Sequence, residues 1–299
     1  MLIHELIELR QALATRKNIG FVPTMGALHE GHLSLVRAAK KQCDCVVVSI
    51  FVNPTQFGPS EDFSKYPRTL QADCELLRGE NVDFVFAPSV DTMYPKGWET
   101  CIDVGSIAGP LEGRFRPGHF RGVASVVLKL FNMVRPDVAF FGQKDFQQVR
   151  VIQKMVDDLN VPVQVVVCPT VREPDGLAMS SRNRYLTPSQ REDALVLYRS
   201  LSKATLRICG ETKVDLVAIR REMERMILAV KDAEIDYVSI ADPDTLEEIH
   251  TLENCPEKIV ILLAVRIGTT RLIDNRVLDI KRQTAEEKTV DGRRQTAGK

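Results

Sequence analysis

The sequence predicts an α/β fold: a Rossmann-like, doubly wound parallel sheet followed by a smaller α+β C-terminal domain. Up to about residue 170, short apolar runs alternate with amphipathic helical patterns, as expected of buried parallel strands with helices on both faces. After residue 175 the order changes to helices followed by β-type runs. We therefore expect a first domain at 1–175, a second at 176–282 and a charged tail at 283–299.

The elements of the first domain follow from this alternation. Residues 1–10 have the pattern of an amphipathic helix. Apolar runs predict strands at 19–22, 45–52, 84–87, 138–141 and 163–168. Patterns of helical spacing predict helices at 31–42, 70–79, 123–134 and 146–160. In such a sheet, ligands are expected at the carboxyl ends of the strands.

The second domain begins with a helix start signal. Thr187 is followed by Pro188 and then by Gln190, the pattern of a capping box with proline at the first helical position. It predicts a helix that ends near residue 208, and a second helix is expected at 214–230. Three strands are expected at 235–240, 259–265 and 271–280. The tail lacks apolar periodicity, which predicts disorder.

Composition excludes several classes of protein. The 299 residues carry 40 basic and 40 acidic side chains, so we expect no nucleic-acid partner, which would require a basic face. No run of 18 apolar residues occurs, and no membrane span is expected. The seven scattered cysteines favour reduced core thiols and a cytoplasmic location.

The most informative segment is 21–33, where an apolar run breaks at Pro23 and small residues lead to His29, Gly31 and His32. A strand, a glycine-containing turn and a helix start form a phosphate site, because glycine lets backbone approach an oxyanion and the helix N-terminus favours negative charge. Histidines three apart share a helix face, so both can point at the anion. A metal site is less favoured, since no cysteine ligand lies nearby.

Two further segments follow strands and are expected at the same edge of the sheet. Asn53 and Gln56 end the second strand, where amides suit a polar substrate, although a simple chain turn at Asn53 is the favoured interpretation. Lys144 follows Gly142 after the fourth strand. It either neutralises phosphate charge or is a solvated surface charge.

Two loops carry hydroxyl and basic groups. Ser180, Ser181 and Arg182 follow the fifth strand and suit recognition of phosphate or carboxylate, or else form a polar hinge. The glycine-rich basic loop at 113–122 is either an anion-binding lid or, as such composition more often indicates, an ordinary surface loop.

These segments together carry a resemblance to a family. Segment 23–32 contains the His-x-Gly-His motif of adenylate-forming nucleotidylyltransferases and class I aminoacyl-tRNA synthetases. Segment 177–183 resembles a degenerate Lys-Met-Ser-Lys-Ser loop of the synthetases. With 50–57 and 141–148, in the expected order, the chain resembles the pantothenate synthetase (pantoate–β-alanine ligase) family over about residues 1–280. The segments 66–69 and 116–120 agree with it.

The resemblance implies an enzyme that condenses pantoate with β-alanine and splits ATP to AMP and pyrophosphate through a pantoyl-adenylate. It also implies Mg²⁺ as cofactor, a homodimer, and pantoate and β-alanine as small-molecule partners. Open alternatives are a related nucleotidylyltransferase that acts on another small substrate, and a nucleotide-binding module without catalysis. The neutral charge disfavours a tRNA-charging enzyme.

The resemblance also implies roles for individual residues. The catalytic set is His32, His29, Lys144 and Arg182. Gln56 and Gln148 would hold pantoate, and Asp73 is a candidate Mg²⁺ ligand. The residues implied for ATP are Met25, Gly26, Ala27, Leu28, His29, Glu30, Gly31, His32, Gly142, Gln143, Lys144, Asp145, Val171, Met179, Ser180, Ser181 and Arg182.

Overall fold

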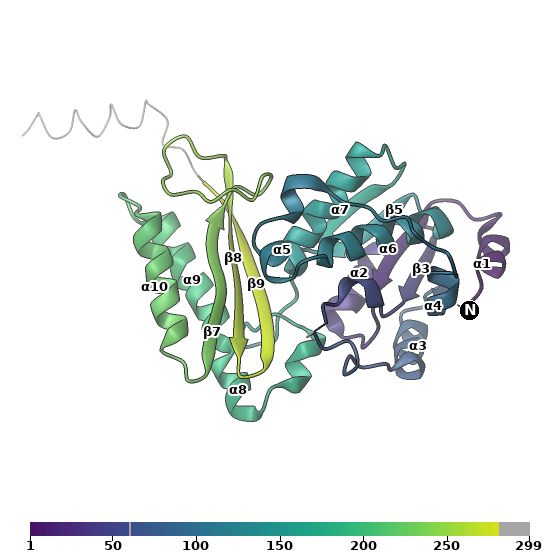
Figure 1. Ribbon diagram of the computed structural model, residues 1–299, viewed down its shortest axis with the longest axis horizontal. Coiled ribbons are helices and arrows are strands. Elements are labelled where there is room, and N and C mark those ends of the chain that lie inside the picture. The colour runs from purple at the N-terminus through teal and green to yellow at the C-terminus, as the bar shows by residue number, and fades with distance from the viewer. Residues whose placement is uncertain (60, 281–299) are drawn as a thin grey trace, which may run out of the picture.

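The computed structural model describes residues 1–59 and 61–280. The predictions for the tail at 283–299 therefore fall outside the described residues. Figure 1 shows two lobes, one built on a parallel sheet and the other on a three-stranded sheet backed by two long helices.

The first lobe contains a six-stranded, wholly parallel sheet in the order β1-β4-β3-β2-β5-β6. The chain adds strands on one side of β2 and then crosses to the other side, so the strand order reverses at β2 and β5. A ligand crevice is expected outside the carboxyl ends of the strands at this point. The strands are β1 (Leu2–Ile3), β2 (Ile19–Thr24), β3 (Cys45–Ile50), β4 (Phe84–Phe86), β5 (Val138–Gly142) and β6 (Gln164–Cys168).

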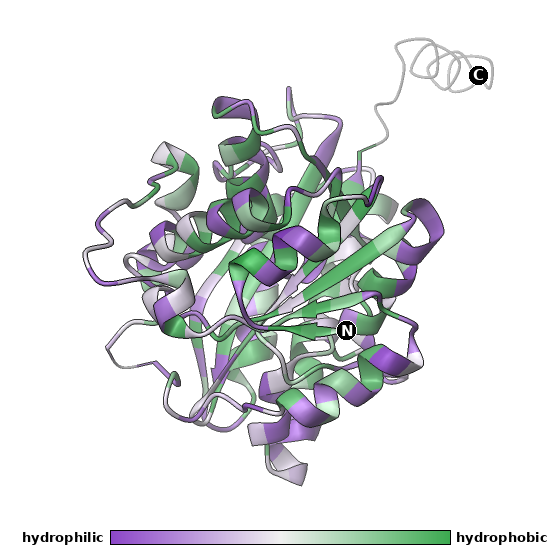
Figure 2. Ribbon diagram, turned by 90° about the vertical axis from the view of Figure 1, so that its right-hand side faces the viewer, coloured by the Kyte–Doolittle hydropathy of each residue, from purple (hydrophilic) through white to green (hydrophobic). Residues whose placement is uncertain are grey.

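Helices cover both faces of this sheet, as the apolar strands require. Phe21 points into a core shared with α1, α6 and α7, whereas its neighbour Val22 points into a core shared with α2 and α3. Figure 2 shows the hydrophobic strands enclosed in this way. The helices are α1 (Leu6–Leu13), α2 (Glu30–Gln42), α3 (Leu70–Gly79), α4 (Val90–Met93), α5 (Glu112–Phe115), α6 (His119–Val134) and α7 (Phe146–Asp158). The doubly wound fold is confirmed.

The prediction of a helix from residue 1 is wrong for the first five residues. Leu2 and Ile3 form β1 and pair with Val85 and Phe86 of β4, and α1 begins only at Leu6. Ile3 is fully buried, so its apolar side chain serves the sheet. The spacing of apolar residues does not predict a strand here, because the partner strand β4 is distant in sequence.

The second lobe is an antiparallel sheet, in the order β7-β8-β9, covered by helices. The capping box is present: the Thr187 hydroxyl accepts from the Gln190 N–H at 3.3 Å, and the Gln190 side chain accepts from the Thr187 N–H at 3.0 Å. The elements are α8 (Pro188–Asp193), α9 (Leu195–Gly210), α10 (Leu216–Leu228), β7 (Ala233–Ala241), β8 (Lys258–Ile267) and β9 (Thr270–Asp279).

Strand β8 joins the two lobes because both of its faces are buried. Ile259 and Ile261 pack with α9 and α10, whereas Val260 and Leu262 belong to the core of the first lobe. The three-stranded sheet thus lies between its own helices and the first lobe (Figure 1). Among the described residues, no helix is long and apolar enough to cross a membrane.

Candidate active site

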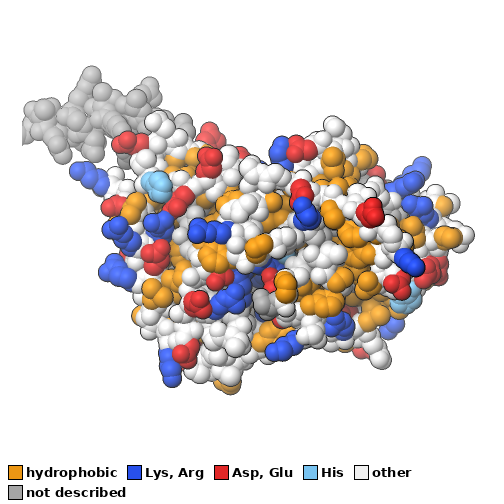
Figure 3. All heavy atoms as spheres, in the orientation of Figure 1, with side chains coloured by type: hydrophobic (Ala, Val, Ile, Leu, Met, Phe, Trp, Pro, Cys, Tyr) orange, Lys and Arg blue, Asp and Glu red, His pale blue; other side chains and the backbone are white. Residues whose placement is uncertain are grey.

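Two adjoining cavities of about 210 and 750 Å³ open at the carboxyl ends of β2, β3, β5 and β6. Figure 3 shows basic and acidic side chains gathered in the depression between the lobes. The smaller cavity brings together most of the residues that the sequence singled out. They are Met25, His29, Gly31, His32, Gln56, Gly142, Lys144, Asp145, Gln148, Val171, Met179, Ser180, Ser181 and Arg182.

His29 is the N-cap of helix α2 and His32 lies in its first turn, with the ring centroids 4.1 Å apart and the ring planes tilted by 45°. The Nδ1 of His29 accepts from the Gly31 N–H at 3.2 Å, and the Nδ1 of His32 accepts from the His29 N–H at 3.4 Å. An accepting Nδ1 carries no hydrogen, so each neutral ring holds its proton on Nε2. Each histidine thus caps the helix and keeps an Nε2–H donor for the cavity.

Both histidines are neutral at neutral pH. Burial, reinforced by the Lys144 ammonium, lowers the pKa of His29 to about 4. Burial, together with His29 and Lys144, lowers the pKa of His32 to about 3. At neutral pH the rings therefore carry no positive charge to offer a bound anion. Instead they supply neutral hydrogen-bond donors, and the cations of the site are Lys144 and Arg182.

Lys144 follows β5 on a short turn that the second lobe holds in place. The Asn275 side-chain amide of β9 donates to the carbonyl oxygens of Gln143 and Lys144, both at 2.9 Å. The Lys144 side chain is 19% exposed, its Nζ lies 3.5 Å from Asp145, and it lines both cavities. These contacts argue against a freely solvated surface charge.

Arg182 and the serines before it form a turn beside the cavities. The Ser180 hydroxyl accepts from the Arg182 N–H at 3.2 Å, and the Ser181 hydroxyl lies 3.4 Å from the Tyr66 hydroxyl. The guanidinium of Arg182 pairs with Asp62 at 3.1 Å. An anion that binds in the smaller cavity would meet a cation that is already held in place.

Gln56 is buried with its amide orientation fixed. Its Oε1 accepts from Asn53 Nδ2 at 3.1 Å, and its Nε2 lies 3.1 Å from the Met25 sulfur. The Tyr94 hydroxyl donates to Asn53 Oδ1 at 2.7 Å. Asn53 therefore does more than turn the chain: it directs the N–H side of Gln56, which lines the smaller cavity together with Gln148.

Six of the implied residues line neither cavity: Gly26, Ala27, Leu28, Glu30, Gln143 and Asp73. The Glu30 carboxylate pairs with Arg37, and the Gln143 amide donates to Asn275 at 3.2 Å. Asp73 is buried, and its oxygens accept from the N–H groups of Ala27 and Leu28 at 3.0 and 2.8 Å. Asp73 thus holds the turn before the histidines and does not fit a Mg²⁺ ligand.

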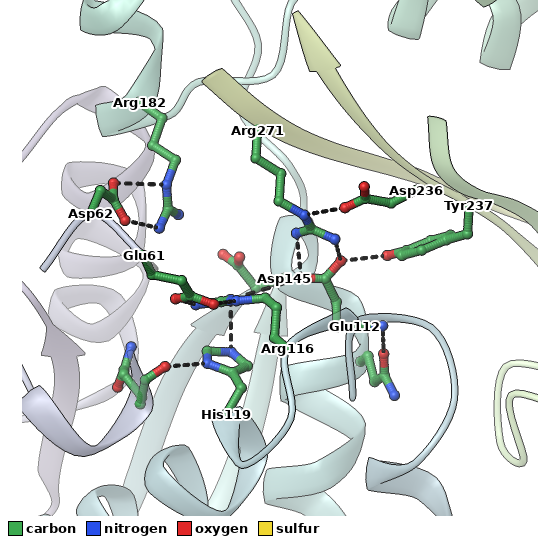
Figure 4. Close-up of polar contacts among 12 residues, drawn as sticks. Glu61, Asp62, Glu112, Arg116, His119, Asp145, Arg182, Asp236, Tyr237 and Arg271 are labelled. Atoms are coloured by element: carbon green, nitrogen blue, oxygen red, sulfur yellow. Dashed lines mark hydrogen bonds and ion pairs between the residues drawn. The ribbon is translucent and has the colours of Figure 1, made fainter. Parts of the chain in front are cut away.

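A network of charged residues lies beside the larger cavity (Figure 4), and the sequence indicated only its members in segment 113–122. Arg116 lies between Glu61, at 2.7 Å, and His119, at 3.0 Å. Glu112 makes a two-pronged ion pair with Arg271 of β9, with both N–O distances 2.7 Å. Segment 113–122 lies largely in α5 and the first turn of α6, so the prediction of an ordinary surface loop, which its composition favoured, is wrong about the loop.

The described residues do not form a metal site by themselves. No group of three or more His, Cys, Asp or Glu side chains in the described part of the chain has the arrangement of a metal site. Asp145 is the single carboxylate among the described residues that line the smaller cavity. A Mg²⁺ ion would therefore need ligands from a bound phosphate compound.

Comparisons with known proteins identify the family. The family model described as pantoate-beta-alanine ligase matches residues 1–277. The pantothenate synthetase of Roseiflexus castenholzii is 58% identical over 262 residues, which cover 87% of this chain and 92% of the relative. That of Moorella thermoacetica is 54% identical, covering 92% and 99%. The chain belongs to the pantoate–β-alanine ligase family.

Solved structures support the family at the level of the fold. The crystal structure of pantothenate synthetase from Thermus thermophilus is 45% identical, covers 94% of this chain and 99% of its own, and has a TM-score of 0.87. The Francisella tularensis pantoate–β-alanine ligase, complexed with beta-gamma ATP and β-alanine, is 36% identical and covers 93% and 97%, with a TM-score of 0.76. The activity of the family, and of this chain, is ATP-dependent ligation of pantoate to β-alanine.

Proposed function

We propose that the smaller cavity binds ATP and pantoate side by side and forms a pantoyl-adenylate there. The observation that carries the proposal is the convergence, in one cavity, of two neutral imidazoles, two cations and two glutamine amides. The cavity lies at the reversal of strand order, where ligands of such sheets are expected.

Each group suits a part of the first step. The α2 N-terminus, the His29 and His32 Nε2–H donors and Lys144 would meet the ATP phosphates, with Ser180, Ser181 and Arg182 on the other side. A pantoate carboxylate oxygen attacks the α-phosphorus and pyrophosphate leaves. Charge grows on the phosphates, so preorganised donors lower the barrier.

Gln56 and Gln148 would hold pantoate beside the nucleotide. Gln56 presents its N–H side because Asn53 occupies its oxygen. In the second step the neutral amine of β-alanine attacks the acyl carbon, the carbonyl–oxygen bond to AMP breaks, and the nitrogen loses a proton. The larger cavity shares Lys144, Gln148 and Arg182 with the smaller one and offers β-alanine a route to the adenylate.

We propose that Mg²⁺ enters with ATP, since Asp73 is already engaged with backbone N–H groups. Phosphate oxygens would supply most of its ligands, with Asp145 the nearest available carboxylate on the cavity wall. When bound, the ion would neutralise phosphate charge. Lys144 and Arg182 provide the remaining positive potential from the protein.

The order of chemistry is tested by isotope exchange and label transfer. Labelled pyrophosphate should exchange into ATP with pantoate present and β-alanine absent. Carboxylate-¹⁸O pantoate should pass one labelled oxygen to AMP. Label in pyrophosphate or phosphate instead would mean activation by phosphoryl transfer. No exchange and no AMP under any substrate set would favour a binding module, and AMP transfer without need of an amine would favour another nucleotidylyltransferase.

We also propose a cytoplasmic homodimer. Three of the buried cysteines, Cys43, Cys45 and Cys168, are free thiols, which suits a reducing compartment. Strand β6 lies at the sheet edge, where Val167 is 39% exposed, and such an edge favours pairing with another chain. Light scattering should give twice the chain mass, and Val167→Lys should shift the protein to monomer. A monomeric wild type would contradict the proposal.

A further inference from the structure

The turn that carries Gln56 rests directly on the first turn of α6. A Cβ on Gly122 would lie 2.4 Å from the Thr55 carbonyl oxygen, so the absence of a side chain permits contact between the two backbones. The Asn53 Nδ2 donates to the Gly122 carbonyl oxygen at 3.2 Å. The position of Gln56 in the cavity is therefore set by α6.

His119, the first residue of α6, contacts the backbone of Gln56. The ring is 7% exposed, and its Nδ1 lies 2.9 Å from the Gln56 carbonyl oxygen. Its Nε2 lies 3.0 Å from Nη1 of Arg116. A guanidinium only donates, so Nε2 accepts, the ring proton is on Nδ1, and Nδ1–H donates to Gln56. Both nitrogens are thus used within the protein.

Glu61 holds the Arg116 side chain in the orientation that contacts His119. Its two carboxylate oxygens accept from Nε and Nη2 of Arg116 at 2.8 and 2.7 Å, which leaves Nη1 for the histidine. Burial, with Arg116 nearby, lowers the pKa of His119 to about 4. The neutral tautomer with hydrogen on Nδ1 therefore persists at neutral pH. Figure 4 shows the chain from Glu61 through Arg116 to His119.

We propose that His119 is a positioning residue for pantoate: its Nδ1–H holds the Gln56 backbone so that the Gln56 amide faces the substrate. The inference rests on the proposed assignment of Gln56 to pantoate. His119 lines the larger cavity but not the smaller one that holds Gln56 and the motif histidines. It therefore acts on pantoate in the smaller cavity through Gln56.

Two substitutions of similar polarity test the role of Nδ1. His119→Asn places an amide nitrogen the same number of bonds from Cβ as Nδ1 and keeps the donor to Gln56. His119→Gln places its amide near the Nε2 position and loses that donor. We expect His119→Gln to raise the KM for pantoate about tenfold, the effect of one lost hydrogen bond. The KM for ATP should stay within about twofold, and His119→Asn should retain most of the wild-type pantoate KM.

A control separates positioning from the stability of α6. Ser125 lies on the same helix, is buried, and its hydroxyl accepts from the Ile102 N–H at 2.9 Å. Ser125→Ala should lower the melting temperature and leave the pantoate KM unchanged. An equal rise in pantoate KM in Ser125→Ala, or equal behaviour of His119→Asn and His119→Gln, would overturn the inference.

Gln56→Ala, alone and combined with His119→Gln, distinguishes the inference from the assignment on which it rests. Both singles should raise the pantoate KM, and the double variant should resemble Gln56→Ala, because His119 acts only through Gln56. Additive effects would overturn the inference. A raised KM in Gln56→Ala with a normal KM in His119→Gln would overturn the inference alone. A normal KM in Gln56→Ala would overturn the assignment and the inference with it.

Discussion

At the residue scale, burial and its neighbours keep the His32 ring neutral, and we propose that its Nε2–H donates a directed hydrogen bond to the phosphates. Loss of one preorganised donor to a developing oxyanion typically costs about 10²–10³ in rate. We predict that His32→Ala loses adenylate formation by about this factor while it remains folded. Single-turnover assays and thermal melts would measure both. The exposed His250 provides the control His250→Ala, and near-normal turnover in folded His32→Ala would contradict the assignment.

Lys144 should act on the nucleotide. We predict that Lys144→Ala raises the KM for ATP far more than the KM for β-alanine, since its ammonium, on the β5 turn, lines both cavities. Steady-state kinetics with each substrate varied would show the difference. Lys154, more than half exposed and paired with Asp158, gives the control Lys154→Ala. Unchanged ATP use in Lys144→Ala would show that its charge serves the fold alone.

The sequence could predict the site residues that belong to local motifs, but not those that only the folded chain brings into contact. His29, His32 and Lys144 each follow a strand that periodicity predicts. Glu61 and Arg116 are 55 residues apart, and no local pattern links them. Asp73 shows the reverse problem, since an acidic residue in a helix pattern looks the same whether its carboxylate faces a cavity or backbone N–H groups.

At the element scale, the start of α2 depends on a glycine beneath a histidine ring. A Cβ on Gly31 would lie 2.9 Å from Cε1 and 3.0 Å from Nδ1 of His29. We predict that Gly31→Ala displaces the His29 ring and lowers turnover, with a much smaller effect on the melting temperature, because alanine favours the helix. Gly79→Ala, also in a helix but with nothing within 4 Å of the new Cβ, should keep full activity. Equal turnover in the two variants would contradict this.

Elements with a strong internal pattern were predictable, and elements defined by a distant partner were not. The helix expected at 70–79 is α3, Leu70–Gly79, and the strands of the sheet core are where the apolar runs lie. The two-residue β1 depends on pairing with β4, 83 residues away. The short α5 ends in Arg116 at its C-cap, and its Glu112 pairs with Arg271 of β9. Neither the β1–β4 pairing nor the Glu112–Arg271 ion pair leaves a local pattern in the sequence.

At the scale of the whole molecule, Glu112 and Arg271 join the two lobes at the larger cavity, with side chains 8% and 15% exposed. Removing one partner of a buried ion pair costs about 3–5 kcal/mol. We predict that Glu112→Gln lowers the melting temperature by several degrees. Asp103→Asn, which breaks the exposed pair with Arg121, should leave it unchanged. Differential scanning calorimetry would measure both, and equal shifts would contradict a special role for the contact between lobes.

The buried histidines also make the stability of the whole molecule depend on pH. The pKa values of His29 and His119 fall to about 4, and that of His32 to about 3, from an ordinary value of 6.5, because burial disfavours the charged rings. Below pH 6.5 the unfolded chain therefore binds protons that the folded protein does not, so the free energy of unfolding falls as pH falls. Carboxylates titrate mostly below pH 5, which leaves the window from pH 7 to 5 to these histidines.

We predict a clear loss of unfolding free energy between pH 7 and pH 5, measured by urea denaturation at each pH. The buried ring of His119 alone should account for about 2 kcal/mol of it. Because asparagine does not titrate, His119→Asn should be less sensitive to pH over this window, even though it keeps the hydrogen bond to Gln56. Equal slopes in wild type and His119→Asn would mean that His119 binds a proton in the folded state, and the tautomer that Arg116 and Gln56 require of it would then be lost in the same window.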